Sequence, residues 1–369
     1  MSASTFQTIA IVAPGLETWL HAEWCALLPN AAGHIVPGGV EGRLTLEQIR
    51  RLAAGSWLAE GVRVRVGRFE ARRLGDVVSG VQKVAWHPWT ARDARPELSV
   101  TCKKSKLIHS GAVADRVREG LDAALRMEAR RTEGLLHVRV AHDTVTLSMD
   151  AAGERLHRRG WREHHATAAL RETSAAALLS IAGWTPEVPL LDPFCGSGTI
   201  AIEAARRAAG SGPRMRAHYA MDAWPCARGL ATSPAPELAP APEPARVFAS
   251  DHAFESVEAA IKNARRAEVS GWLTCATRDA AEAIARAPAG CAVVTNLPYG
   301  KRVEAGAALD DALAALGDAV RARADLGPIL LLSAQTGLRK RTGLRMAEIA
   351  SFSNRGIHVR AWRVTPPAR

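Results

Sequence analysis

The sequence has little with which to build a metal centre or a disulfide framework. Its six cysteines lie far apart without paired spacing, so neither a zinc motif nor a set of disulfides is indicated, and a reducing compartment is favoured. No apolar run approaches the roughly 20 residues that span a bilayer. The first residues also lack the basic and apolar regions of a signal peptide. We therefore expect a cytoplasmic protein with no metal ion and no membrane contact.

Acidic residues are also in short supply. Lys and Arg number 48 against 37 Asp and Glu, and the net charge is +11. Such an excess favours a nucleic acid as partner, because cations that neutralise phosphates release counterions. The excess is spread evenly, however, and Arg far outnumbers Lys, so a coding bias is the alternative explanation. Charge alone favours nucleic acid only weakly.

The chain shows two patterns of predicted secondary structure. At 369 residues it is long enough for two or three domains. Up to about residue 155, strands and helices mix without strict βαβ repetition, which is typical of small α+β units. From Pro189 onward, apolar strands alternate with helices, which predicts an α/β, doubly wound and mostly parallel sheet. A basic segment, 158–167, lies at the boundary, and the proline-rich segment 233–244 is predicted to be a solvated loop.

The segment 190–205, LLDPFCGSGTIAIEAA, has the pattern of a strand, a glycine turn and a helix. Asp192 ends the strand at the edge where open α/β sheets bind ligands. Gly196 and Gly198 allow positive φ, and Thr199 begins a helix whose N-terminus suits a carboxylate. The turn lacks the lysine of a phosphate-binding P-loop and the third glycine of a dinucleotide fingerprint. It therefore predicts a site for a different small polar cofactor.

Two later acids also follow predicted strands. Asp251 ends the strand after the glycine turn, where an acid binds ribose hydroxyls in Rossmann-like folds. Asp279 follows the next strand, where a carboxylate could accept a hydrogen bond from an adenine amino group. Taken singly, an acid at such a position is more often a helix cap. Together with Asp192, the two acids favour binding of an adenosyl group.

The tetrapeptide Asn296-Leu297-Pro298-Tyr299 follows the fourth strand of the predicted sheet. An amide oxygen and the Leu297 carbonyl can hold both hydrogens of an exocyclic amine and aim its nitrogen at a methyl donor. Pro298 rigidifies the turn, and Tyr299 can stack on a base lifted out of its helix. Methylation of a pyrimidine carbon would need a cysteine nucleophile near this loop. We interpret the two nearest candidates, Cys195 and Cys291, as packing residues.

These segments together resemble the THUMP-domain RNA methyltransferases that form N2-methylguanosine. The resemblance covers nearly the whole chain and includes the basic segments 103–109 and 156–162. The chain departs from the family pattern at Leu297, where proline is usual, and at Ala249-Ser250, where a glycine usually precedes the acid. The Leu297 variant keeps the carbonyl that the chemistry needs.

The resemblance implies three domains and a set of site residues. The domains are a ferredoxin-like domain (1–62), a THUMP RNA-binding domain (63–155) and a Rossmann-like class I methyltransferase domain (156–369). The implied cofactor is S-adenosyl-L-methionine, with contacts from Asp192, Phe194, Gly196, Gly198, Thr199, Asp251, Asp279 and Thr173. The implied catalytic residues are Asn296, Leu297, Pro298 and Tyr299. The implied contacts to RNA phosphates are Lys103, Lys104, Lys106, Arg158, Arg159 and Arg162. For any single one of these basic residues, a solvated face is the alternative.

The implied activity is formation of N2-methylguanosine in structured RNA by a monomeric enzyme. We favour 23S rRNA as the substrate, with the tRNA acceptor stem as the alternative. Methyltransferases of glutamine N5 or of adenine N6 use a similar tetrapeptide, but they would not carry a THUMP-like N-terminal half. A non-catalytic RNA-binding protein is disfavoured because the residues of both motifs are intact.

Overall fold

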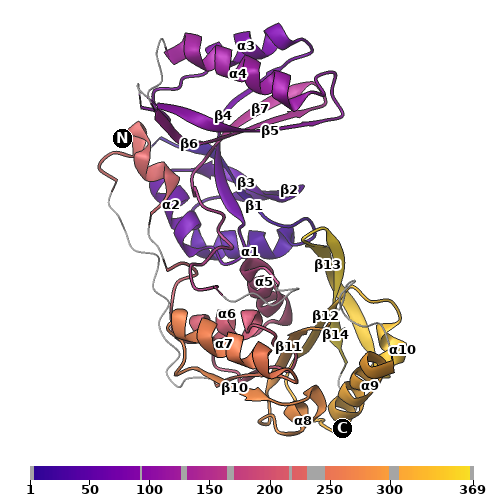
Figure 1. Ribbon diagram of the computed structural model, residues 1–369. Helices are drawn as coiled ribbons and strands as arrows, with labels where there is room; N and C mark the ends of the chain where they lie inside the picture. Colours follow the sequence, from indigo (N-terminus) through magenta and orange to yellow (C-terminus); the bar gives the residue numbers. More distant parts are fainter. Residues whose placement is uncertain are drawn as a thin grey trace. The chain divides into compact units, whose positions relative to one another are not determined.

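The chain forms two compact units, shown in Figure 1. The first comprises Met1–Ile11, His21–Leu156 and Ala217–Pro234; the second comprises Val12–Leu20, His157–Arg216 and Ala235–Arg369. The computed structural model describes residues 4–91, 94–125, 131–163, 170–215, 218–230, 246–298 and 307–365. Among these residues, no helix is long and apolar enough to cross a membrane.

The first unit contains a seven-stranded sheet with the strand order β2-β3-β1-β4-β7-β6-β5. Its strands are β1 (Phe6–Ile11), β2 (Gly33–Val36), β3 (Gly39–Leu44), β4 (Gly61–Glu70), β5 (Ala94–Lys103), β6 (Arg131–Ala141) and β7 (Thr144–Asp150). Its helices are α2 (Leu46–Gly55), α3 (Leu74–Gln82) and α4 (Ser110–Leu125), and it shares α1 (Glu17–Leu27) with the second unit. A capping box fixes the start of α2, because Thr45 and Gln48 each bind the other's backbone N–H.

The first four strands and two helices of this sheet have the split βαβ arrangement of ferredoxin-like domains. β1 pairs antiparallel with both β3 and β4. β4 is long enough to pair with β1 along one edge and with β7 along the other. The predicted boundary at residues 62 and 63 therefore falls inside a strand that both parts share, and the division into separate domains stays a prediction.

Two further features complete the first unit. β5 pairs parallel with β6, and α3 and α4 pack together against this part of the sheet (Figure 1). A later segment, with the short helices η1 (Ala220–Ala223) and η2 (Pro225–Ala227), also belongs here. Trp224 from this segment meets Trp89 edge to face, with ring centroids 5.2 Å apart. The first unit therefore includes a segment that lies between strands of the second unit in the sequence.

The second unit contains a seven-stranded sheet with the order β10-β9-β8-β11-β12-β14-β13. Its strands are β8 (Leu190–Asp192), β9 (Val247–Asp251), β10 (Leu273–Thr277), β11 (Ala292–Asn296), β12 (Ile329–Ser333), β13 (Met346–Asn354) and β14 (Ile357–Val364). Its helices are α5 (Glu172–Ala182), α6 (Thr199–Ala208), α7 (Phe254–Arg266), α8 (Ala280–Ala285), α9 (Ala307–Arg321) and α10 (Leu338–Thr342).

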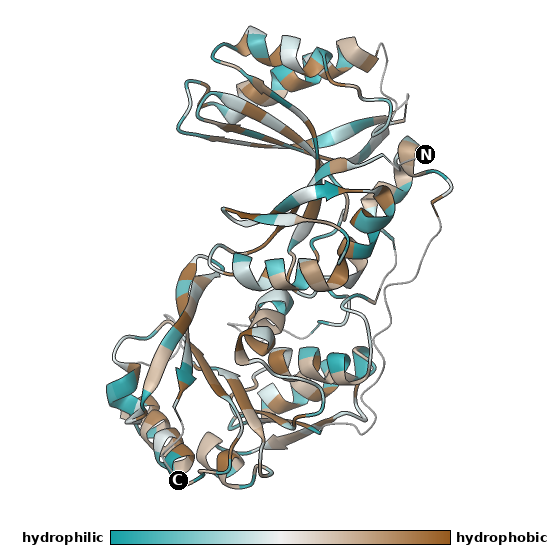
Figure 2. Ribbon diagram, turned by 180° about the vertical axis from the view of Figure 1, so that it is seen from behind, coloured by the Kyte–Doolittle hydropathy of each residue, from teal (hydrophilic) through white to brown (hydrophobic). Residues whose placement is uncertain are grey.

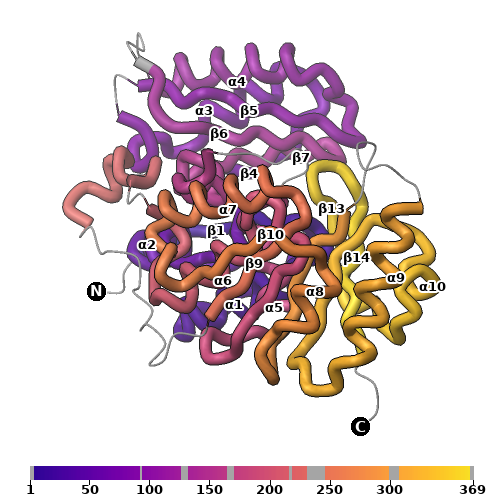
Figure 3. Tube along the Cα trace, turned by 60° about the horizontal axis from the view of Figure 1, so that its bottom comes forward, coloured from indigo at the N-terminus to yellow at the C-terminus, as the bar shows by residue number. Residues whose placement is uncertain are grey.

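Helices cover both faces of this sheet. α5, α6 and α7 pack side by side in one group, and α8, α9 and α10 form the other (Figures 1 and 3). The central strands β11 and β12 are almost wholly apolar because they are buried on both faces. The helices are two-toned in hydropathy, as expected of covering layers with one wet face (Figure 2).

The predicted fold class, a doubly wound, mostly parallel sheet preceded by an α+β part, is confirmed by this architecture. β8 to β12 are parallel, whereas β14 runs antiparallel between β12 and β13. The sequence interpretation missed β13, because the charged and polar residues of Met346–Asn354 obscure any apolar pattern. β13 is the edge strand of the sheet, and at such a position only one face of the strand needs to be apolar.

Candidate active site

The cofactor motif and the tetrapeptide end two neighbouring strands, β8 and β11, which pair in parallel. The strand order reverses between these two strands, and open α/β sheets bind ligands at such a switch point. The hydroxyl of Thr295 donates a hydrogen bond of 2.6 Å to Oδ1 of Asp192. A single hydrogen bond thus joins the acid of the first motif to the residue that precedes Asn296.

Asp192 is the most deeply buried acid of the site, with 1% of its surface exposed. Burial raises the pKa of its carboxyl to about 7, and the nearby Asp251 carboxylate acts in the same direction. Hydrogen bonds from the Thr295 hydroxyl and the Phe194 N–H oppose the rise without cancelling it. A positively charged ligand group near Asp192 would favour the ionised form.

The glycine turn has the conformation that the sequence predicts. Gly196 and Gly198 have φ of 50° and 84°, and Thr199 is the first residue of α6. A Cβ on Gly198 would lie 3.0 Å from the Cβ of Ala260, so α7 packs closely against the turn. The Gly196 N–H donates to Oδ2 of Asp251 at 3.0 Å, and the Cys195 N–H donates to the Ser250 carbonyl at 2.9 Å. The turn is therefore fixed to the carboxyl end of β9.

The two later acids have different local roles. Asp251 is 9% exposed, and besides the turn it accepts from the N–H of Ala253. Asp279 is exposed and caps α8, accepting from the N–H of Glu282 at 2.8 Å. A helix cap was the alternative interpretation of an acid at this position. The capping hydrogen bond occupies one carboxylate oxygen of Asp279. A contact between Asp279 and an adenine ring stays a prediction.

Among the predicted site residues that the structure describes, Asn296 and Thr173 each have a buried side-chain oxygen, Oδ1 and Oγ1, without a hydrogen-bond partner. A buried polar atom without a partner costs about 1–3 kcal/mol, so native proteins rarely keep one without a function. Asn296 and Thr173 were both predicted site residues. Their unpartnered oxygens are the kind of atom that a polar ligand would satisfy.

The rest of the tetrapeptide is anchored on the sheet. The Leu297 N–H donates to the Leu332 carbonyl at 2.9 Å, and the Leu297 side chain belongs to the apolar core beside α9. The partly buried ring of Phe194 packs against the same core. Tyr299 lies outside the described residues, so its predicted stacking role stays a prediction.

The predicted RNA contacts fall into two groups. Lys103, Lys104 and Lys106 are exposed in the first unit, at the end of β5 and in the loop that follows. The Lys106 N–H donates to Asp143 at 2.8 Å, which ties this loop to the turn between β6 and β7. Arg158 is also exposed.

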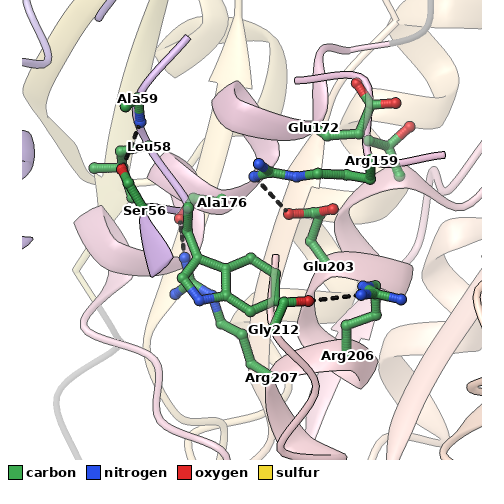
Figure 4. A network of polar contacts seen from close by, with 12 residues as sticks. Ser56, Leu58, Ala59, Arg159, Glu172, Ala176, Glu203, Arg206, Arg207 and Gly212 are labelled. Atoms are coloured by element: carbon green, nitrogen blue, oxygen red, sulfur yellow. Dashed lines mark hydrogen bonds and ion pairs between the residues drawn. The ribbon is translucent and has the colours of Figure 1, made fainter. Parts of the chain in front are cut away.

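Arg159 and Arg162 require a correction, because both lie in the interior of the second unit. Arg159 is 1% exposed and pairs with the fully buried Glu203 at 3.2 Å (Figure 4). Arg162 pairs with Glu172 at 3.0 Å and donates to the Thr199 hydroxyl at 2.8 Å. Burial lowers the pKa of Arg162 and raises that of Glu172. A buried guanidinium cannot reach an RNA phosphate, so these two arginines support the cofactor turn from within.

The sequence interpretation also missed two residues of the site. Thr295 links the two motifs, and Gln335 contacts the tetrapeptide from the loop after β12. A hydroxyl residue at the end of the apolar run AVVT was a usable signal for Thr295. Gln335 had no such signal, because only the fold brings it to residue 298. No cluster of His, Cys, Asp or Glu able to hold a metal occurs among the described residues.

The fold is an open, Rossmann-like sheet with an acid at the end of β8 and an amide at the end of β11, and the comparisons identify it as that of a methyltransferase. Residues 159–359 match the RMKL-like methyltransferase domain of the UPF0020 family. The match covers more than half of the chain, and the chain belongs to this family. The predicted S-adenosylmethionine-dependent methyltransferase fold is thereby confirmed.

Two relatives extend the likeness to the N-terminal half. A proposed RNA methyltransferase of Synechocystis sp. is 28% identical over 373 residues, covering 96% of both chains. The ribosomal RNA large subunit methyltransferase K/L of Syntrophotalea carbinolica is 29% identical over 339 residues. That alignment covers 86% of this chain but 47% of the relative, so the chain spans about half the length of this protein.

Solved structures share the fold over nearly the whole chain. A proposed methyltransferase crystallised with S-adenosylhomocysteine has a TM-score of 0.86 at 20% identity, with both chains fully covered. A protein from Listeria monocytogenes, named as an N6-adenine-specific DNA methylase by prediction, has a TM-score of 0.84 at 23% identity, covering 99% of this chain and 97% of its own. TrmN from Thermus thermophilus has a TM-score of 0.72 at 21% identity, covering 98% of this chain and all of its own.

Proposed function

We propose that the chain transfers a methyl group from S-adenosyl-L-methionine to the exocyclic N2 of a guanosine in structured RNA. The observation that carries the proposal is the Thr295–Asp192 hydrogen bond, which holds the cofactor motif and the tetrapeptide together at one edge of the sheet. The buried amide oxygen of the neighbouring Asn296 has no hydrogen-bond partner in the described part of the chain. When bound, the cofactor supplies an electrophilic methyl group.

Each site residue has a role in this proposal. The N-terminus of α6 and the glycine turn face the carboxylate of the cofactor, and Asp251 binds its ribose. Phe194, Thr173, Asp192 and Asp279 complete the cofactor contacts. Oδ1 of Asn296 and the Leu297 carbonyl accept hydrogen bonds from the target amine, while Pro298 limits the motion of that carbonyl. Tyr299 stacks on the flipped base. No general base is needed, because the product ammonium loses its proton to water.

RNA is the proposed substrate for reasons that lie outside the site. The relatives that share both halves of the chain carry names of RNA and ribosomal RNA methyltransferases. The exposed Lys103, Lys104 and Lys106 on the first unit offer phosphate contacts there. Within RNA, 23S rRNA is the favoured substrate and the tRNA acceptor stem the alternative. A protein acting as a monomer in the cytoplasm fits this role.

Adenine N6 is the closest competing target, because its amine satisfies the same two acceptors. The name of the Listeria structure points to that reaction, although its 23% identity supports a shared fold and no more. Guanine is preferred because the N-terminal half resembles the enzymes that form N2-methylguanosine. The two targets give different products and are therefore separable by experiment.

The test is methylation of 23S rRNA and tRNA transcripts in vitro, followed by mass analysis of the nucleosides. We expect N2-methylguanosine. N6-methyladenosine would overturn the choice of guanine, and a methylated ring carbon would overturn the amine chemistry as well. Asn296→Ala should lower kcat by about 10²–10³-fold, as loss of one preorganised polar contact does elsewhere. Its affinity for S-adenosylhomocysteine should match that of the wild type; loss of that affinity would make Asn296 structural.

A further inference from the structure

The carbonyl of Pro298 is held by a chain of three polar side chains from elsewhere in the second unit. Nε2 of Gln335 donates to the Pro298 carbonyl. Oε1 of Gln335 accepts from the guanidinium of Arg341, which is in turn paired with Asp310. The three side chains come from the loop after β12, from α10 and from the first turn of α9. A guanidinium donates hydrogen bonds but cannot accept them, so Oε1 of Gln335 must face Arg341. Nε2 of the same amide therefore faces the Pro298 carbonyl.

The backbone segments that carry Gln335 and Arg341 are held in fixed positions. Ser333 accepts from the Gln335 N–H at 3.0 Å, which fixes the backbone of the glutamine. α10 is docked tightly on α9, because a Cβ on Gly317 would lie 1.8 Å from the Thr342 carbonyl oxygen. Arg321 of α9 donates to the same carbonyl at 2.8 Å. Arg341, one residue earlier, is therefore presented to Gln335 by a fixed backbone.

These contacts restrict the orientation of the Leu297 carbonyl. The Leu297–Pro298 pair is held at one end by the Leu297 N–H on β12 and at the other by the Pro298 carbonyl on Gln335. The proline ring locks φ between them, and the peptide bond is planar. With both ends held, the Leu297 carbonyl has one direction in which to point. Without Gln335 the outer end would be free, and ψ of Leu297, the dihedral that sets the direction of its carbonyl, would be restrained from one side only.

We infer that Gln335 is a positioning residue for the methyl-accepting amine, held in place by Arg341, and that it acts by aiming the Leu297 carbonyl. The inference rests on the proposed role of that carbonyl. It also assigns Arg341, which is partly buried, a structural partner inside the protein, although an arginine beside an RNA-modifying site would ordinarily be taken as a phosphate contact.

The kinetic test uses Gln335→Ala, Arg341→Met and the double variant, with Lys340→Met as the matched control on the same helix. Gln335→Ala should lower kcat by about 10–100-fold, the usual effect of misplacing a reacting group by a fraction of an ångström to one ångström. Affinity for S-adenosylhomocysteine should not change. The double variant should be no slower than Gln335→Ala, because residues of one network are not additive. Additive effects, or an Arg341→Met variant that only weakens RNA binding, would overturn the inference.

A second measurement does not depend on activity. The chain has four glutamines, Gln7, Gln48, Gln82 and Gln335, so nitrogen-15 labelling of glutamine gives a simple spectrum of side-chain amides. The Gln335 amide protons should exchange slowly with solvent in the wild type and in Lys340→Met, and quickly in Arg341→Met. Fast exchange in the wild type would overturn the inference, whichever RNA is methylated. Slow exchange in a protein that methylates no RNA would instead overturn the proposed function and leave the Gln335 contact standing.

Discussion

Two regions of the chain use positive charge in opposite ways. In the first unit, Lys103, Lys104 and Lys106 are exposed on a loop whose backbone is fixed by hydrogen bonds. In the second unit, Arg159 and Arg162 are buried beneath the cofactor turn and paired with Glu203 and Glu172. Both groups looked alike in the sequence, as short basic segments with an implied role in RNA binding.

The difference shows that net charge does not measure the size of a binding surface. A buried guanidinium is already neutralised by its carboxylate and contributes to the position of the chain around it. An exposed lysine contributes little to stability and keeps its charge available to a partner. Substitutions in the two regions should therefore change different measured quantities, stability in one and RNA affinity in the other.

The largest expected effect is on stability, from Arg159→Met. The substitution removes one partner of a buried ion pair and leaves the Glu203 carboxylate without it, a change that costs about 3–5 kcal/mol of the free energy of unfolding. Urea denaturation measures this loss. The double variant with Glu203→Leu should recover much of it, because both charges of this pair are then removed together. If Arg159→Met instead left stability intact and weakened RNA binding, the buried pair would not exist in solution.

The next largest effect is on the pH dependence of stability, and it comes from the buried carboxyl of Asp192. The pKa of Asp192 is about 7 in the folded chain, above its value near 4 when unfolded, so the folded state binds the extra proton. The stability linked to this proton is fully present below about pH 4 and is lost as the pH rises through 7, by about 4 kcal/mol at most. Asp192→Asn cannot ionise and should lack this fall.

Urea denaturation at pH 5, 6.5 and 8 would measure the slope for Asp192→Asn against the wild type. Asp279→Asn is the matched control, because asparagine caps a helix as well as aspartate does and Asp279 is exposed. Its pH profile should follow the wild type. A wild-type slope retained in Asp192→Asn would place the titrating group elsewhere.

A smaller effect is expected on cofactor affinity from Asp251→Ala. The substitution removes the acceptor of the Gly196 N–H and the proposed ribose contact, so binding of S-adenosylhomocysteine should weaken by about 1–3 kcal/mol. Calorimetry measures the change. Asp251→Asn keeps one acceptor oxygen and should lose less. Equal affinities for all three proteins would mean that the ribose is bound by other residues.

The smallest effect on stability belongs to the exposed lysines. Changing Lys103, Lys104 and Lys106 together to glutamine should alter the free energy of unfolding by no more than about 0.5 kcal/mol. RNA affinity should fall, and the slope of log affinity against log salt should decrease by about 2–3, since each phosphate contact contributes about 0.7–0.9. An unchanged salt slope would remove this loop from the RNA-binding surface.

Some elements were predictable because their signals are local. Pro189 to Ser333 shows apolar runs of strand length separated by helical spacing, and β12 has the predicted bounds because every residue of Ile329–Ser333 is buried. The positive φ of Gly196 and Gly198 followed from the turn that the strand and helix require. Segment 218–230 shows the limit, because nothing local indicates that it joins the first unit, where Trp224 packs on Trp89.

The sequence by itself determined the class of sheet, the cofactor turn and the tetrapeptide, because each depends on residues that are neighbours along the chain. Only the tertiary structure decided which basic residues are buried, since Arg159 and Glu203 meet across 44 positions of sequence. It likewise decided that Thr295 binds Asp192 and that Gln335 binds the Pro298 carbonyl. Burial and long-range hydrogen bonds arise from packing, and packing depends on all the elements at once.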